Sequence, residues 1–296
     1  MVACTSNGTV AYSHFVMGRT ILRRVSGPRD VLARAAPPPD LTLSYGPAPE
    51  HLVDVRLPAA PGARPLLVVV HGGFWMAAYD RVHTGPQSAG LADAGHVVAT
   101  VEYRRVGQRG GGWPGTFDDV ALLADTVPRL LAEALPGRVD VASTVLVGHS
   151  AGGHLAVWAA SRHRLPAGSP WHLPARPAVA VVALAGVLDL EHSERLGLGG
   201  HAAKALLGGS PRRRPERYAE ADPAGLLPTG VRTVLVHGTA DAAVPVEVSR
   251  AYAERATAAG DDATLHELEG IGHYELIDPL SSAWPAVLAA VTSLTS

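Results

Sequence analysis

Short apolar segments rich in β-branched residues recur along this chain and alternate with longer amphipathic segments. The apolar segments are LLVVV at 66–70, HVVATVEY at 96–103, STVLVG at 143–148, AVAVVAL at 178–184 and VRTVLVH at 231–237. A strand without a polar face must be covered on both sides, which is typical of parallel sheets. LVDVRL at 52–57 alternates instead, as a half-exposed strand does. The pattern predicts an α/β fold.

The segments between these strands predict helices and one long insertion. Helices are expected near 84–94, 118–134, 151–163, 246–259 and 282–294. Regular succession of strand and helix predicts a mostly parallel central sheet flanked by helices. The stretch from about 187 to 228 breaks this succession and is rich in Gly, Pro, Arg and His, as functional lids and loops often are. We expect a catalytic domain at 41–296 with a small cap insertion at about 187–228, preceded by an N-terminal arm or linker at 1–40.

Charge and cysteine content exclude several classes of partner. A formal net charge of -2 provides no general attraction to nucleic acid or anionic membranes. Cys4 is the only cysteine, so no intrachain disulfide forms and the cytoplasm is the expected location. No apolar stretch approaches the ~20 residues of a membrane helix. We expect no nucleic-acid or membrane partner, and a homodimer is compatible with the sequence.

A nucleophile motif follows the strand STVLVG. Gly148, His149, Ser150, Ala151 and Gly152 form the pattern GxSxG between a strand and a helix. A serine in this pattern sits on a sharp turn, where side chains in place of the glycines would collide with neighbouring backbone. The turn presents the hydroxyl at the carboxyl end of the sheet. Ser150 is therefore the predicted nucleophile.

An alcohol needs a base, and the base needs a group that holds its tautomer. Asp241 follows the strand VRTVLVH, and His273 lies in the loop GIGHYE after the strand candidate ATLHEL. The order Ser, Asp, His is the order of the α/β hydrolases. We predict Ser150, Asp241 and His273 as a triad. The alternatives are the strand-end histidines His71, His149 and His237 and the carboxylates Asp189 and Asp222.

A glycine pair follows the strand LLVVV in the segment HGGFW at 71–75. A tetrahedral intermediate carries negative charge on the former carbonyl oxygen, and each backbone N–H aimed at that oxygen lowers the barrier by around 3 kcal/mol. Glycines let the backbone approach closely enough to aim these donors. The predicted oxyanion hole draws on Gly72, Gly73 and Phe74, with Ala151 after the nucleophile as a further donor.

Taken together, HGGFW, VEYRR at 101–105, GHSAGG, HGTAD and the GH of GIGH resemble the esterase and lipase branch of the α/β hydrolases over about residues 45–290. The HGGxW form resembles kynurenine formamidases, which hydrolyse the formamide of N-formylkynurenine. The resemblance implies an α/β-hydrolase fold. It also implies that Arg104 stabilises its strand end, with Asp118 or Asp119 as its partner.

The predicted reaction is acyl transfer from a small, partly apolar or aromatic ester or amide through an acyl-enzyme. Substrate contacts are expected from Phe74, Trp75, His149 and Trp171. No cofactor or metal is implied, because the sequence has no HExxH, clustered-cysteine or EF-hand pattern. An acyltransferase or cyclase would use the same triad. A binding protein on a hydrolase scaffold is the remaining alternative.

Overall fold

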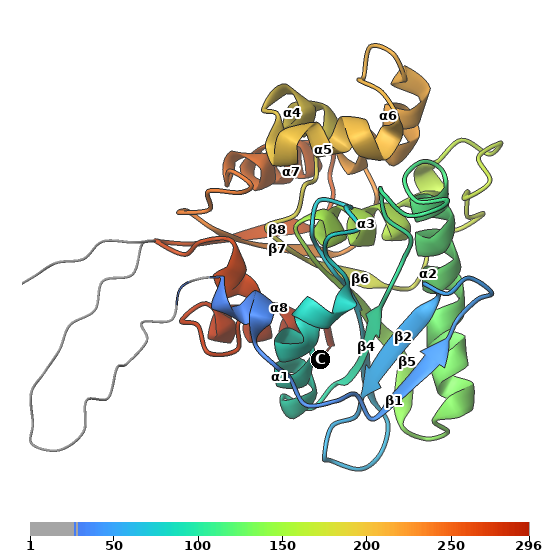
Figure 1. Ribbon diagram of the computed structural model, residues 1–296, viewed down its shortest axis with the longest axis vertical. Helices are drawn as coiled ribbons and strands as arrows, with labels where there is room; N and C mark the ends of the chain where they lie inside the picture. The colour runs from blue at the N-terminus through green and yellow to red at the C-terminus, as the bar shows by residue number, and fades with distance from the viewer. Residues whose placement is uncertain (1–26, 28, 296) are drawn as a thin grey trace, which may run out of the picture.

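The computed structural model describes residue 27 and residues 29–295, which are built around one eight-stranded sheet (Figure 1). The strands are β1 Leu41–Ser44, β2 Leu52–Arg56, β3 Arg64–Val70, β4 Val97–Val101, β5 Val139–His149, β6 Ala180–Leu184, β7 Thr233–Gly238 and β8 Ala263–Leu268. Their order is β1-β2-β4-β3-β5-β6-β7-β8. The pairs β1/β2 and β2/β4 are antiparallel and all other pairs are parallel. The predicted mostly parallel sheet is confirmed.

The central strands are covered on both faces. Along β3, Leu66 and Val68 pack into one hydrophobic core, whereas Leu67 and Val69 pack into a second core on the opposite face. All four side chains are at most 1% exposed. Successive strand residues point to opposite faces, so a strand inside two cores has no polar position. This burial explains the unbroken apolar run in the sequence.

Helices form the two outer layers. The helices are α1 Gly85–Asp93, α2 Gly115–Ala134, α3 Ala151–Ala160, α7 Glu247–Ala258 and α8 Trp284–Thr295, with short 3-10 turns at η1 Asp30–Ala33, η2 Arg81–Thr84, η3 Arg162–Arg164, η4 Pro223–Gly225 and η5 Tyr274–Ile277. Side chains of α1 and α8 belong to one core, and those of α2, α3 and α7 belong to the other. Figure 1 shows α8 and α1 together, away from α2 and α3. No helix within these described ranges combines the length and hydropathy needed to cross a membrane.

The segment between β6 and β7 carries three further helices. These are α4 Leu190–Arg195, α5 Leu198–Leu207 and α6 Pro215–Ala221, which lie together at the top of Figure 1. Gly197, Gly199, Gly200 and His201 all have positive φ at the start of α5. The helices occupy the stretch for which the sequence predicts a cap.

The last part of the predicted arm packs against the sheet domain. Val31 in η1 is fully buried in the same core as α1 and α8. Arg34 forms a bidentate ion pair with Asp278, in which Nη2 of Arg34 lies 2.9 Å from Oδ2 of Asp278. Residues 1–26 of the predicted arm, including Cys4, lie outside the described residues, as do residues 28 and 296.

Candidate active site

Ser150 lies on a sharp turn between β5 and α3. Its φ and ψ of 55° and -118° are rare for a residue with a side chain, and helix α3 begins at the next residue. A Cβ at Gly148 would lie 2.2 Å from the carbonyl oxygen of Gly152, and one at Gly152 would lie 2.0 Å from that of Val70. Both distances are too short for any side chain. The turn therefore requires glycine on either side of the serine.

Asp241 and His273 come together from two neighbouring loops at the carboxyl ends of β7 and β8. Nδ1 of His273 lies 2.6 Å from Oδ2 of Asp241. The other carboxylate oxygen of Asp241 accepts hydrogen bonds from the N–H groups of Ala243 and Val244, both at 2.8 Å. This arrangement orients the carboxylate and gives His273 an acceptor for its Nδ1 proton.

His237 is a further ligand of the Asp241 carboxylate. Its Nε2 lies 2.9 Å from the carbonyl oxygen of Val244 and 3.3 Å from Oδ2 of Asp241, and its Nδ1 lies 2.7 Å from the hydroxyl of Ser249. Burial raises the pKa of Asp241, but hydrogen bonds from His237 and His273 outweigh burial and hold this pKa well below its usual range. Asp241 is therefore an anion throughout the physiological pH range.

His149, the residue before Ser150, packs against the ring of His273. The two ring centroids lie 4.4 Å apart, and Nε2 of His149 donates to the backbone carbonyl of His273 at 3.0 Å. Burial, followed by the neighbouring His273, lowers the pKa of His149 well below its usual value. A neutral His149 thus supports the loop of His273 without adding a charge beside it.

Ser150 and His273 open into one pocket of about 840 Å³. Its walls come from the arm, the turn after β3, the start of α5 and the loops that carry Asp241 and His273; they include Arg29, Leu32, Gly73, Phe74, Tyr79, His83, His149, Leu198, Gly199, Tyr274 and Glu275. The Ser150 hydroxyl is buried and has no hydrogen-bond partner among the described residues. Hydrogen bonds between catalytic groups often tighten only when substrate is bound.

The turn after β3 lies against Ser150. A Cβ at Gly72 would lie 3.3 Å from Cβ of Ser150, and Gly73 and Phe74 line the pocket together with Ser150. Across the described residues, no protein acceptor receives a hydrogen bond from the N–H groups of Gly73, Phe74 or Ala151. Ala151 is the first residue of α3, where helix N–H groups lack internal partners. The donors at Gly73 and Phe74 border the pocket and are available to a negatively charged oxygen there, whereas Gly72 and Ala151, also predicted as donors, are not among the residues that line it.

Two residues predicted as substrate contacts lie away from the pocket. Trp75 is 1% exposed, and its indole N–H donates to Nδ1 of His154 at 3.2 Å. Trp171 is 5% exposed and donates to Asp118 at 2.8 Å. Both indoles pack in the core shared by α2 and α3, where each indole N–H has an acceptor. This placement corrects the expectation that they face substrate; Phe74 and His149 do line the pocket.

Some pocket residues were not predicted from the sequence. Arg29 and Leu32 come from the arm, in which no motif marks a role in the site. His237, which the sequence offers only as an alternative base, contacts the Asp241 carboxylate, and no motif in the sequence pairs the two residues. Arg104 pairs with Asp119 rather than Asp118.

Within the described part of the chain, no group of three or more His, Cys, Asp or Glu could hold a metal ion.

Residues 53–255 match the BD-FAE family model. Among curated proteins, the chain is 28% identical to Esterase LipC of Mycobacterium tuberculosis over 79% of this chain and 59% of LipC. It is 27% identical to a probable isoprenylcysteine alpha-carbonyl methylesterase of Oryza sativa subsp. japonica, over 84% of this chain and 62% of the rice protein. The chain thus spans about three fifths of the length of these relatives.

Solved structures with a similar fold include a truncated carbohydrate esterase from gut microbiota, with a TM-score of 0.72 and 21% identity over 88% of this chain and 99% of the other. Another is an esterase of Thermogutta terrifontis with propionate bound, with a TM-score of 0.65 and 23% identity over 86% of this chain and 92% of the other. The fold is therefore that of the α/β hydrolases, as the sequence motifs implied. With more than half of its residues matched by the family model, the chain belongs to the BD-FAE family.

Proposed function

We propose that this chain is a serine hydrolase that cleaves a carboxylic ester of a small molecule. The observation that carries the proposal is the pocket into which Ser150 and His273 both open, with Asp241 2.6 Å behind the imidazole. The N–H groups of Gly73 and Phe74 border the same pocket and lack protein acceptors among the described residues. Nucleophile, base, orienting carboxylate and oxyanion donors are the four parts that acyl transfer requires.

The first half of the reaction forms an acyl-enzyme. Oγ of Ser150 attacks the ester carbonyl carbon while Nε2 of His273 accepts the hydroxyl proton. Asp241 stabilises the resulting imidazolium. The carbonyl oxygen becomes an oxyanion and accepts hydrogen bonds from backbone N–H groups of the turn after β3 and of Ala151. The carbon–oxygen bond to the leaving alcohol then breaks, and His273 returns the proton to that alcohol.

Water completes the cycle. His273 takes a proton from water, whose oxygen attacks the acyl carbon, and a second oxyanion forms in the same place. Its collapse breaks the bond to Ser150, and His273 protonates the departing serine oxygen. The products are a carboxylic acid and the regenerated enzyme.

The pocket walls suit a small, partly apolar or aromatic substrate. Phe74, Tyr79, Leu198 and Tyr274 provide apolar and aromatic surface beside Ser150. The narrower proposal, a formamide such as N-formylkynurenine, rests on the HGGFW motif. Because the Trp75 side chain lies in the core, the tryptophan that distinguishes this motif makes no substrate contact that would favour a formamide over an ester. Esters are therefore the leading substrate class.

A substrate panel tests the proposal and separates its alternatives. Turnover of p-nitrophenyl esters of increasing chain length is compared with turnover of N-formylkynurenine, with and without a competing alcohol as acyl acceptor. We expect efficient hydrolysis of short esters to free acid. Preference for the formamide would establish the narrower proposal, and accumulation of the transfer product would indicate an acyltransferase. Absence of turnover on every member of the panel would reject a hydrolase of these substrates.

A further inference from the structure

The turn that supplies the oxyanion donors has an unusual backbone. Gly73, Phe74 and Trp75 have φ values of 106°, 51° and 57°. For the two residues with side chains, such conformations cost on the order of 1–3 kcal/mol each and persist only where surrounding contacts impose them. The donors at 73 and 74 are therefore held in place by groups outside the turn.

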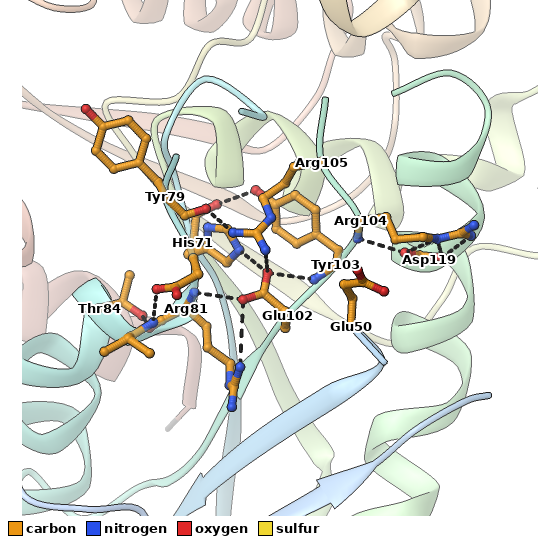
Figure 2. A network of polar contacts seen from close by, with 12 residues as sticks. Glu50, His71, Tyr79, Arg81, Thr84, Glu102, Tyr103, Arg104, Arg105 and Asp119 are labelled. Carbon is orange, nitrogen blue, oxygen red and sulfur yellow. Dashed lines mark hydrogen bonds and ion pairs between the residues drawn. The ribbon is translucent and has the colours of Figure 1, made fainter. Parts of the chain in front are cut away.

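One buried carboxylate contacts the start of this turn. Glu102 follows β4 and is 3% exposed, and its Oε1 lies 2.9 Å from Nε2 of His71, the residue at which the turn begins (Figure 2). Nδ1 of His71 in turn lies 2.8 Å from the carbonyl oxygen of Gly72. The hydroxyl of Tyr103 donates to the carbonyl of His71 at 2.8 Å, and the two rings stack. Glu102 thus determines the orientation of the imidazole that fixes the first peptide of the turn.

The same carboxylate also holds the segment that follows the turn. A guanidinium nitrogen of Arg105 lies 3.3 Å from Oε1 of Glu102, and Arg105 donates a hydrogen bond to the carbonyl of Tyr79 (Figure 2). The backbone N–H of Arg81 donates to Oε2 of Glu102 at 3.1 Å. Tyr79 covers the turn so closely that a Cβ at Gly73 would lie 2.4 Å from Cβ of Tyr79. Glu102 therefore connects the chain on both sides of the oxyanion donors.

Charge makes this connection strong. Burial raises the pKa of Glu102, but the hydrogen bond from His71 and the charge of Arg105 outweigh burial, and the pKa lies below its usual value. Glu102 is consequently an anion in contact with several donors. Hydrogen bonds to a charged acceptor are roughly twice as strong as neutral ones and restrict motion accordingly.

We propose that Glu102 is a positioning residue for catalysis, which acts through His71 and Arg105 to hold the N–H groups of Gly73 and Phe74 where the oxyanion forms. The proposal rests on the proposed hydrolase function. The donors contact the oxygen most strongly once it is negatively charged, so loss of their alignment affects the transition state more than the bound substrate. Changing Glu102 should lower kcat and leave KM nearly unchanged.

Asp119 provides a matched control for mere stabilisation. It is also a buried carboxylate, 1% exposed, with a histidine and an arginine as partners: His51 at 2.8 Å and Arg104. Figure 2 shows it beside Arg104, on the other side of Tyr103 from His71. Asp119 does not line the pocket. Asp119→Asn should therefore cost stability comparable to Glu102→Gln without disturbing the oxyanion donors.

The experiment compares wild type, Glu102→Gln and Asp119→Asn at matched concentrations of folded active sites. It measures Tm, kcat and KM on p-nitrophenyl acetate, and Ki for an alkyl trifluoromethyl ketone. Ser150 adds to the carbonyl of this ketone and its proton passes to His273, so the adduct carries an oxyanion in the hole. We expect Glu102→Gln to lower kcat by about 10²-fold and to raise Ki by a similar factor. Asp119→Asn should lower Tm only.

Each outcome decides the proposal. Wild-type kcat and Ki in Glu102→Gln, or equal losses in both variants, would overturn it. If Glu102→Gln does not fold, His71→Phe keeps the ring that stacks on Tyr103, removes the donor to Glu102 and is judged by the same kcat and Ki. If wild type neither hydrolyses the ester nor binds the ketone, it is the hydrolase function that fails instead.

Discussion

Nδ1 of His273 lies 2.6 Å from Oδ2 of Asp241, whose side chain is fully buried. A carboxylate at this distance keeps the proton of the neutral imidazole on Nδ1, which leaves Nε2 as the basic nitrogen. Backbone N–H groups and His237 hold the carboxylate on its other sides. The imidazole that we propose as the base is thus oriented before substrate arrives.

Replacing Asp241 by Asn tests this orientation. An amide in place of the carboxylate favours the wrong imidazole tautomer and removes the negative charge that stabilises the imidazolium. We expect kcat on p-nitrophenyl acetate to fall by around 10⁴-fold while the far-UV circular dichroism spectrum remains that of wild type. A folded variant with near-normal kcat would mean that another carboxylate orients the base.

The nucleophile turn should not tolerate any side chain at Gly152. A Cβ there would lie 2.0 Å from the carbonyl oxygen of Val70, which belongs to the sheet and cannot move aside. Gly152→Ala is expected to reduce the free energy of unfolding by about 3 kcal/mol or more in urea denaturation. Gly168→Ala is the matched control, because a Cβ there meets nothing within 4 Å and stability should be nearly unchanged. Equal stability of the two variants would contradict the described turn.

The side chain of Trp75 should affect stability rather than substrate choice. Trp75→Phe removes the donor to Nδ1 of His154 and leaves that buried nitrogen unpaired, at a cost of about 1–3 kcal/mol in unfolding free energy. The ratio of kcat/KM for N-formylkynurenine to kcat/KM for p-nitrophenyl acetate should stay at its wild-type value. A selective loss of kcat/KM on N-formylkynurenine would show that the indole reaches the pocket.

Acid should destabilise the fold partly through His154. Burial lowers the pKa of His154 from 6.5 to about 4. Between these two values the unfolded chain binds a proton that the folded chain does not, so the free energy of unfolding falls as pH falls from 6.5 to 4. The contribution is about 3 kcal/mol.

Urea denaturation at pH 7 and pH 4.5 measures this effect. In His154→Phe the stability at pH 7 is expected to be lower than in wild type, because its two hydrogen-bonding partners are left unpaired. The further loss between pH 7 and pH 4.5 should nevertheless be smaller than in wild type. An unchanged loss over that interval would assign the acid sensitivity to other groups.

The central strands of the sheet could be predicted from the sequence because the signal for a buried strand is local. Each central strand carries its own apolar run, and the β-branched residues that form it are visible without knowledge of their neighbours. Strand β1 has no such run, since it is a four-residue edge strand with alternating burial, and it was not predicted. The residues predicted as a triad follow strand ends, and parallel strands bring their carboxyl ends to one edge of the sheet.

Other features of the site depend on contacts between distant segments. Glu102 and His71 are 31 residues apart and lie in separate motifs, and nothing in the sequence indicates that the two side chains pair. Phe74 and Trp75 are neighbours in the chain, yet their positive φ values allow the two side chains to diverge, that of Phe74 to the pocket and that of Trp75 to the core. Such directions are set by backbone conformation and packing, which sequence spacing does not reveal.

Covalent labelling of Ser150 tests the hydrolase proposal most directly. Wild type, Ser150→Ala and His273→Ala are treated with a fluorophosphonate probe, and the modified peptide is identified by mass spectrometry alongside ester turnover. We expect one probe on Ser150 of wild type with complete loss of turnover, slow or no labelling of His273→Ala, and neither labelling nor turnover in a folded Ser150→Ala. Turnover that persists in Ser150→Ala, or a probe attached to a different residue, would contradict the assignment of the nucleophile.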